Sequence, residues 1–189
     1  MHRVTYSMGV SLDGYIVGPD GNITGTAPDD EIWQHVLDEI RGVDVHLMGR
    51  KLYETMLYWE PGREAEASFD EREREWAAAW RLLPKVVFSR TLTSVEGQAR
   101  LAAVGLAEEI ERLRAEPGEG DIAIGGATLA AEAAALDLID EYRFRVYPSL
   151  VGGGISYFPQ AERPVDLELV EARPFRSSPV VHLRYRVLR

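Results

Sequence analysis

The chain has 189 residues and no cysteine, and 46% of its residues are apolar and 28% charged. This is a globular composition, and the length favours a single domain over residues 1–189. Without cysteine, disulfides, thiolate catalysis and cysteine-ligated zinc are excluded. The formal net charge of −10 argues against nucleic-acid binding through a basic face. An anionic ligand would therefore have to be held by backbone amides and a few placed cations.

Two apolar patterns are missing from the chain. The N-terminal residues contain no stretch apolar enough for a signal peptide. Nowhere do about 18 apolar residues follow one another, as a membrane span requires. We therefore expect a cytoplasmic protein with no membrane partner.

Hydrophobic patterns of period 2 and period 3.6 alternate along the first two thirds of the chain. The apolar alternation predicts strands over Arg3–Leu12, Val43–Met48, Val86–Phe88 and Asp121–Ile124. Helical spacing predicts a helix capped by Asp29 or Asp30, a short helix after Gly49, and helices over Glu64–Leu82, Leu106–Ala115 and Gly126–Leu136. Such an alternation indicates a largely parallel sheet covered by helices on both faces.

The last third of the chain has strands without helices between them. The alternation predicts strands over Glu141–Tyr147, Leu167–Val170 and Val180–Val187, with a glycine loop at Val151–Gly154. The last two strands predict an antiparallel hairpin at the edge of a mixed, twisted α/β sheet.

A phosphate site is predicted where an apolar strand runs through Gly125 and Gly126 into a helix. A helix N-terminus carries free N–H groups and a partial positive charge, and glycine lets an anion approach closely. The alternative is a tight strand-to-helix turn with no ligand. The segment is not the G-x-G-x-x-G fingerprint, so a Rossmann fold is a poor fit.

Two more strand ends carry groups suited to phosphate. Gly49 is followed by the cations Arg50 and Lys51, and Ser89 and Arg90 follow a buried strand. Ligands of open α/β sheets gather at the carboxyl ends of strands, so these turns can share one crevice. Read singly, the cations are also consistent with a solvated surface, and Ser89–Arg90 with a plain strand exit.

Asp13 leaves the first strand beside the same crevice. It is a candidate proton donor or substrate anchor, with an Asx-turn at Gly14 as the alternative. The four histidines, His2, His35, His46 and His182, are scattered and show no metal-ligand spacing, so no metal is expected.

Taken together, short blocks in this order resemble the dihydrofolate reductase-like family, in the branch of the C-terminal reductase domain of bifunctional riboflavin-biosynthesis enzymes. The blocks are Ser11–Gly14, Leu47–Arg50 with Tyr53–Glu54, Val87–Leu92, Ile124–Leu129, Leu138–Tyr142, Pro148–Gly154 and Phe158. The resemblance implies a three-layer dihydrofolate reductase-like fold, a homodimer, and NADPH as the hydride donor.

The resemblance also implies roles for residues of this sequence. The cofactor would meet Gly9, Val10, Ile16, Gly49, Arg50, Lys51, Leu52, Ser89, Arg90, Gly126, Ala127, Thr128 and Leu129, with the phosphate turn at Gly125. The substrate would lie near Asp13, Asp30, Trp33 and Trp59.

Two departures limit the choice of substrate. In folate reductases an acidic residue of the first long helix binds the pterin, and the matching position here falls at about Trp33. Riboflavin reductases usually have a cation and a small residue after the segment that matches Ser11–Gly14, but this chain has Tyr15, Ile16 and Val17 there. The resemblance thus implies an NADPH-dependent reductase of a C=N or C=O bond in a small pterin- or aminopyrimidine-like heterocycle. The alternative is a dinucleotide-binding protein of the same fold without turnover.

Overall fold

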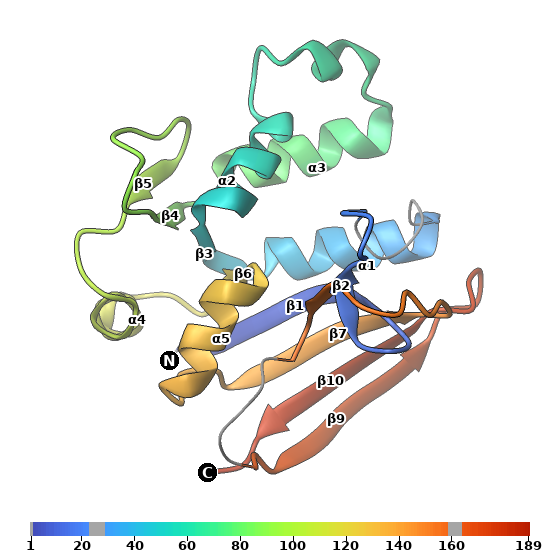
Figure 1. Ribbon diagram of the computed structural model, residues 1–189. Helices are drawn as coiled ribbons and strands as arrows, with labels where there is room; N and C mark the ends of the chain where they lie inside the picture. The colour runs from blue at the N-terminus through green and yellow to red at the C-terminus, as the bar shows by residue number, and fades with distance from the viewer. Residues whose placement is uncertain (1, 23–28, 159–163) are drawn as a thin grey trace.

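An eight-stranded sheet forms the centre of the computed structural model, which describes residues 2–22, 29–158 and 164–189 (Figure 1). The strand order is β5-β4-β3-β6-β1-β7-β10-β9. The strands are β1 (Val4–Ser11), β3 (Val43–Gly49), β4 (Lys85–Phe88), β5 (Ala99–Leu101), β6 (Asp121–Gly125), β7 (Glu141–Tyr147), β9 (Leu167–Pro174) and β10 (Val181–Val187). Neighbours from β5 to β7 pair in parallel, while β10 pairs antiparallel with both β7 and β9. The predicted mixed sheet with an antiparallel edge hairpin is confirmed.

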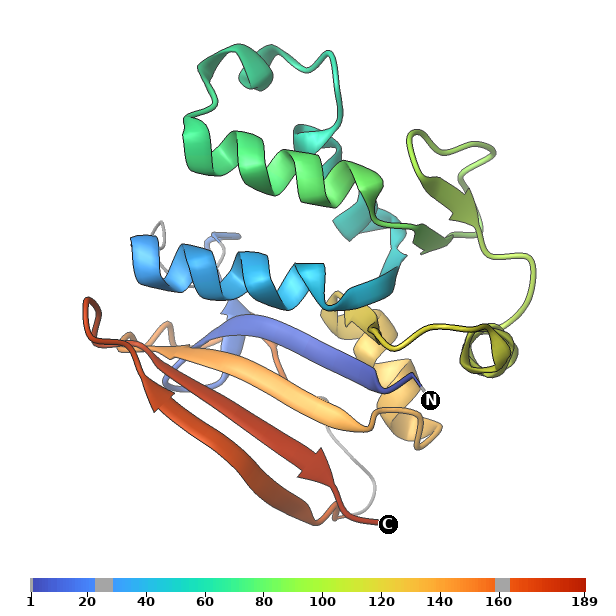
Figure 2. The ribbon, with the colours of Figure 1, turned by 180° about the vertical axis from the view of Figure 1, so that it is seen from behind.

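Helices cover both faces of this sheet (Figures 1 and 2). The helices are α1 (Asp30–Arg41), α2 (Arg50–Met56), α3 (Glu71–Leu82), α4 (Leu106–Ala115) and α5 (Ala127–Ala135), with 3-10 turns η1 (Leu57–Trp59) and η2 (Glu64–Ser68). Helices α1 and α3 lie on one face, and α4 and α5 lie on the other. The predicted three-layer fold is therefore confirmed. Within the described ranges, no helix has both the length and the apolar character needed to cross a bilayer.

The core is divided by the alternation of side chains along the strands. Leu47, Ile122 and Ile124 point to the face covered by α4 and α5 and belong to the largest apolar cluster. Met48 and Val87 point to the other face and pack with Trp80 of α3. Because the central parallel strands are apolar on both faces, they can be buried between two helical layers.

The face of β7 and β10 beneath α1 is polar and yet buried. Arg143 and Arg145 are each only 9% exposed, and Glu141 is fully buried. Glu141 accepts from the Nε of both Arg143 and Arg184, and Arg145 donates to Glu39 of α1. A layer of paired charges therefore joins α1 to this half of the sheet.

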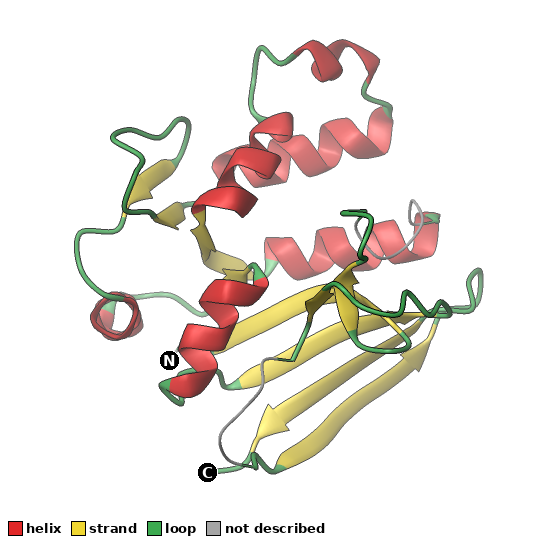
Figure 3. Ribbon diagram, in the orientation of Figure 1, coloured by secondary structure: helices red, strands yellow, loops and turns green. Residues whose placement is uncertain are grey.

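The structure corrects two of the predicted elements and adds three short strands (Figure 3). The single helix expected over Glu64–Leu82 is instead η2 followed by α3, because Asp70 caps a new helix in a capping box with Glu73. The strand expected over Leu167–Val170 continues to Pro174. Three short strands escaped prediction: β2 (Tyr15–Val17), β5, and β8 (Ile155–Ser156), which pairs with β2 in a small second sheet.

Candidate functional site

Three strand-to-helix or strand-to-loop turns lie side by side at the carboxyl ends of the central strands. In the sheet register, Met48 of β3 is opposite Gly125 of β6, and Gly49 is opposite Phe88 of β4. The structure therefore brings together the Gly49, Ser89 and Gly125 turns that the sequence places far apart. This is the edge at which parallel α/β sheets bind ligands.

Gly125 and Gly126 have different surroundings. A Cβ on Gly125 would lie 2.4 Å from Leu52 Cδ2 and 2.5 Å from His46 Cε1, so packing alone requires a glycine there. Gly126 has φ +89°, and a Cβ there would meet only Leu52 Cβ at 3.9 Å. Gly125 is therefore required by packing, whereas Gly126 is required by its positive φ and has room for a Cβ.

The N-terminus of α5 has backbone donors that are not capped by any side chain among the described residues. Gly126 is its N-cap and provides no side-chain hydrogen bond, and the first helical bond runs from the Ala130 amide to the Gly126 carbonyl. The amides of Ala127, Thr128 and Leu129 precede that bond and belong to the free first turn. The Leu129 side chain is buried in the core, so only its backbone can face a ligand.

The cations of the Gly49 turn differ in how they are held. Arg50 Nη1 donates to Glu54 Oε1 at 3.0 Å, one turn later on α2. Lys51 is exposed and has no ion pair with any residue that the structure describes. Leu52 is half-buried and contacts the second apolar cluster. Lys51 is therefore the freer of the two charges.

The Ser89 hydroxyl organises its own turn. Ser89 Oγ accepts from the amides of Thr91 at 3.2 Å and Leu92 at 3.0 Å. Arg90 between them is exposed. The turn therefore presents the Arg90 guanidinium to solvent at the end of β4, while Ser89 mainly shapes the backbone.

Gly9, Val10 and Ile16 lie on β1 and β2, next to the same edge. Val10 is 3% and Ile16 4% exposed, and both belong to the main core. Gly9 is opposite Arg145 in the pairing of β1 with β7. These two apolar side chains thus support the sheet, and a ligand at this place would meet the backbone.

Asp13 joins two loops. Its carboxylate accepts from Ser11 Oγ at 2.6 Å and from the amides of Val151 at 3.2 Å and Gly152 at 2.8 Å. The hydrogen bonds from Ser11 and from these two amides hold the pKa of the Asp13 carboxyl below its usual range. Asp13 is therefore ionised at neutral pH, and an ionised carboxylate accepts hydrogen bonds but has no proton to donate.

The tryptophans of the predicted substrate region lie in one group. The ring centroids of Trp33 and Trp59 are 6.4 Å apart, and Trp76 of α3 lies 6.3 Å from Trp33 and 6.2 Å from Trp59. Trp76 was not among the predicted site residues, although its spacing from Trp80 places both on one face of a helix. Asp30 lies at the start of α1, where its exposed carboxylate pairs with Arg72 Nη1 at 2.5 Å.

The Arg72 guanidinium also lies 5.7 Å from the Trp33 ring centroid. Asp30 and Trp33 are therefore linked through a residue of α3. The Trp33 indole nitrogen is buried and has no hydrogen-bond partner among the described residues. The predicted substrate region thus combines the tryptophan rings, the Asp30–Arg72 ion pair and the indole N–H of Trp33, which has no acceptor among the described residues.

Comparison with known proteins identifies the family. The profile of the RibD C-terminal domain matches residues 2–181. The uncharacterized protein YyaP of Bacillus subtilis (strain 168) is 30% identical over 186 residues, which cover 97% of this chain and 94% of YyaP. The chain and this relative therefore correspond over nearly their whole lengths.

Solved structures share the fold at lower identity. A putative riboflavin biosynthesis protein from Shewanella sp. PV-4 superposes with a TM-score of 0.78 at 22% identity, over 99% of both chains. The diaminohydroxyphosphoribosylaminopyrimidine deaminase/5-amino-6-(5-phosphoribosylamino)uracil reductase of Thermotoga maritima gives a TM-score of 0.64 at 15% identity, covering 99% of this chain and 57% of that one. The chain belongs to the RibD C-terminal domain family.

Proposed function

We propose that the protein is an NADPH-dependent reductase that acts on a C=N or C=O bond of a small pterin- or aminopyrimidine-like heterocycle. The observation that carries the proposal is the Gly126 turn, where a glycine at φ +89° is the N-cap of α5 and no side chain caps the helix. Family membership and the adjacent turns at Gly49 and Ser89 support it. The Thermotoga relative is named as a reductase of a phosphoribosylated aminouracil, which suggests the substrate class.

The residues of the crevice suit a dinucleotide. NADPH would supply a hydride, and the chain would bind and orient it. In this proposal the amides of Gly126, Ala127, Thr128 and Leu129 bind the diphosphate, as helix N-termini bind phosphates. The exposed cations Lys51 and Arg90 bind the ribose 2′-phosphate, and Gly49 and Ser89 form the turns that place them.

The substrate would be held at the far end of the same crevice. Trp33 and Trp59 offer aromatic faces on which a flat heterocycle can stack. In this proposal Asp13 is a positioning residue, because its carboxylate fixes the β1–β2 turn against the Val151–Gly152 backbone. As an ionised group it can also accept a hydrogen bond from a substrate amine, and the proton that reduction requires in addition to the hydride would come from solvent water.

The test is binding and turnover with a variant of the turn. Gly126→Ala forces a positive φ on alanine at the N-cap of α5, so we expect NADPH affinity to fall about tenfold or more, measured by calorimetry. Gly62→Ala is the matched control, because Gly62 has φ +75° with nothing within 4 Å of a Cβ and lies outside the crevice. It carries the same backbone strain and should bind NADPH as the wild type does.

Turnover separates the reductase from the binding-protein alternative. Wild-type protein is mixed with NADPH and a panel of pterins and aminopyrimidines, and loss of NADPH absorbance is followed. Consumption with at least one substrate supports the reductase. Binding without consumption across the panel would support the dinucleotide-binding protein, and no NADPH binding by the wild type would refute both.

A further inference from the structure

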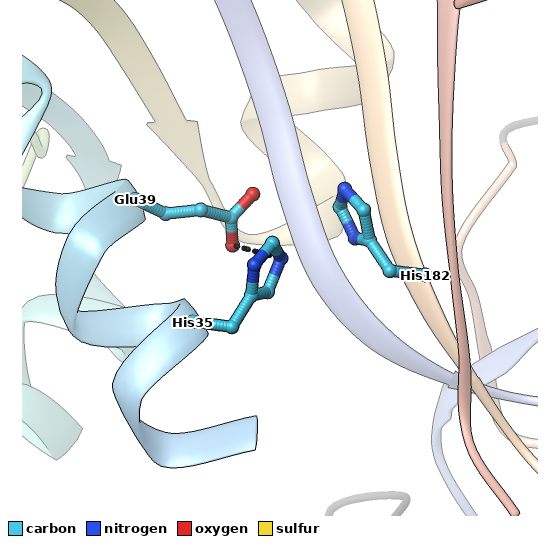
Figure 4. Close-up of side chains that lie close together, drawn as sticks. All are labelled: His35, Glu39 and His182. Atoms are coloured by element: carbon cyan, nitrogen blue, oxygen red, sulfur yellow. Dashed lines mark ion pairs between the residues drawn. The ribbon is translucent and has the colours of Figure 1, made fainter. Parts of the chain in front are cut away.

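Three potential metal ligands meet in the charged layer beneath α1 (Figure 4). His35 and Glu39 come from one face of α1, at i and i+4, and His182 comes from β10 opposite them. The two imidazole ring centroids are 4.3 Å apart, and His35 Nε2 lies 3.9 Å from Glu39 Oε2. One ligand atom from each of the three residues lies within 4.8 Å of the others.

Both imidazoles have an unused nitrogen. His35 Nε2 and His182 Nδ1 are buried and have no hydrogen-bond partner in the part of the chain that the structure describes. His182 is only 1% exposed, so its ring lies away from bulk water. A buried polar atom without a partner destabilises the fold, and a bound cation would remove that penalty by accepting the nitrogen lone pair.

The cluster also has room beside it. A cavity of about 240 Å³ is lined by His35, Glu39 and His182, with Asp38, Glu171 and Arg184 among its other residues. His35 and Glu39 are 12% and 16% exposed through their side chains, so the group is not sealed from solvent. An ion and a water molecule can therefore enter.

We propose that His35, Glu39 and His182 bind one divalent transition-metal ion of the zinc class, with a water molecule as the fourth ligand. Two imidazoles and one carboxylate are the ligands that zinc takes in sites with an open position. Imidazole nitrogen selects zinc, copper and nickel over magnesium and calcium, which prefer oxygen. The ion would join α1 to β10 and so fasten the helical layer to the edge hairpin.

Glu39 already has partners, and the site must accommodate them. Its Oε2 accepts from Arg145 Nη1 at 2.6 Å, and Ser7 Oγ donates at 3.2–3.3 Å to either oxygen. A carboxylate has about four lone-pair positions, so Glu39 can keep Arg145 and still bind the ion. The positive charge of the Arg145 guanidinium disfavours a metal ion beside it. Both imidazoles must therefore be neutral, so that they donate a lone pair and add no further positive charge.

The test uses tag-free protein stripped of metal. Zn²⁺ is titrated in competition with a chromophoric chelator, and Co²⁺ is titrated while the visible spectrum is recorded. We expect one ion per chain, a four-coordinate Co²⁺ absorption band, and a Tm raised by about 5 °C at saturating Zn²⁺, with no rise in Mg²⁺. His35→Gln and His182→Gln should each weaken Zn²⁺ binding about tenfold or more.

His2→Gln is the matched control, because His2 is also buried and lies outside the cluster, where its ring nitrogens contact the carbonyls of Gly120 and Glu116. It should bind Zn²⁺ as the wild type does. Absence of Zn²⁺ binding by the wild type, an octahedral Co²⁺ spectrum, or unchanged affinity in both cluster variants would overturn the proposal. The wild-type spectrum decides the matter even if a variant fails to fold, and NADPH binding is scored separately.

Discussion

At the scale of single residues, Arg90 and Arg50 are the same kind of side chain, but only Arg50 is held in an ion pair. Arg50 is paired with Glu54, whereas Arg90 is exposed at the end of β4 and has no ion pair in the described ranges. Only a cation that is free in the unliganded protein can bind a phosphate without first breaking an ion pair. Discrimination between NADPH and NADH therefore falls to Arg90 and Lys51 in the proposed site.

Arg90→Gln should weaken NADPH binding about tenfold and change NADH binding little, because only NADPH carries the 2′-phosphate that a guanidinium pairs with. Both affinities are measured by calorimetry at one ionic strength. Arg186→Gln serves as the control, since Arg186 is half-exposed and pairs with Glu168 at the edge hairpin. An equal loss for both nucleotides would contradict a 2′-phosphate role for Arg90.

His46 makes stability depend on pH. Burial, with the nearby Lys85 ammonium, lowers the pKa of His46 from 6.5 to about 4. As the pH falls below 6.5, the unfolded chain takes up a proton that the folded chain refuses until about pH 4. Stability should therefore fall across this window, by up to about 1.4 kcal/mol per pH unit for this group.

The measurement is the free energy of unfolding in urea at pH 7 and at pH 5. His46→Gln should show a smaller loss than the wild type, while part of the loss remains because burial also lowers the pKa of His182 to about 4. The same pH dependence in His46→Gln and the wild type would exclude His46 as a source.

Some residues of the site could be read from the sequence, and others could not. The Gly49, Ser89 and Gly125 turns were predictable because each directly follows an apolar strand, and parallel strands end at one edge. The different reasons why Gly125 and Gly126 must be glycines could not be predicted, because they depend on Leu52 and His46, which pack against the turn. The histidine cluster was missed as well, since only His35 and Glu39 share a helical spacing and His182 comes from a distant strand.

At the scale of elements, the α3 boundary depends on one side chain. Asp70 accepts from the Glu73 amide at 2.9 Å, and Glu73 Oε2 accepts from the Asp70 amide at 2.8 Å. Residues 64–82 are rich in good helix formers, so the composition predicted one helix. The cap, and the burial of Phe69 just before it, divide the segment in two.

Asp70→Ala should lower the free energy of unfolding by about 1 kcal/mol, because α3 loses its N-cap. Thermal unfolding should show this as a fall in Tm of about 2–4 °C. Asp70→Ser keeps an N-cap oxygen and should recover most of the loss. If serine and alanine behaved alike, the ion pair of Asp70 with Arg72 would be the stabilising contact and not the cap.

The short strands were beyond prediction for a related reason. β2 and β8 have three and two residues and exist only because they pair with each other across more than a hundred positions. β5 has three residues and pairs with β4 at the edge of the sheet. Such segments have too few residues for an alternation of apolar and polar side chains to be recognised in the sequence. They form strands because neighbouring strands pair with them.

At the scale of the whole molecule, large apolar side chains remain exposed along the Pro148–Phe158 connection. Leu150 is 73%, Ile155 48% and Phe158 43% exposed. The predicted homodimer would cover this surface, and Ile155→Glu should then shift the protein towards the monomer in light scattering. Leu82→Glu, on α3 and 79% exposed, should leave the mass unchanged. A wild-type monomer at all concentrations would refute the dimer.

The position of β1 in the sheet has a consequence for how the chain folds during synthesis. β1 precedes both of its neighbours in the chain, and the residues of β6 and β7 pair with it across more than a hundred positions. Its edge towards β6 therefore stays unpaired until residues near Gly125 have emerged, and its edge towards β7 until residues near Tyr147 have emerged. Since such non-local pairing slows folding, the nascent chain carries β1 with open edges while the more than one hundred residues that separate it from β6 are synthesised.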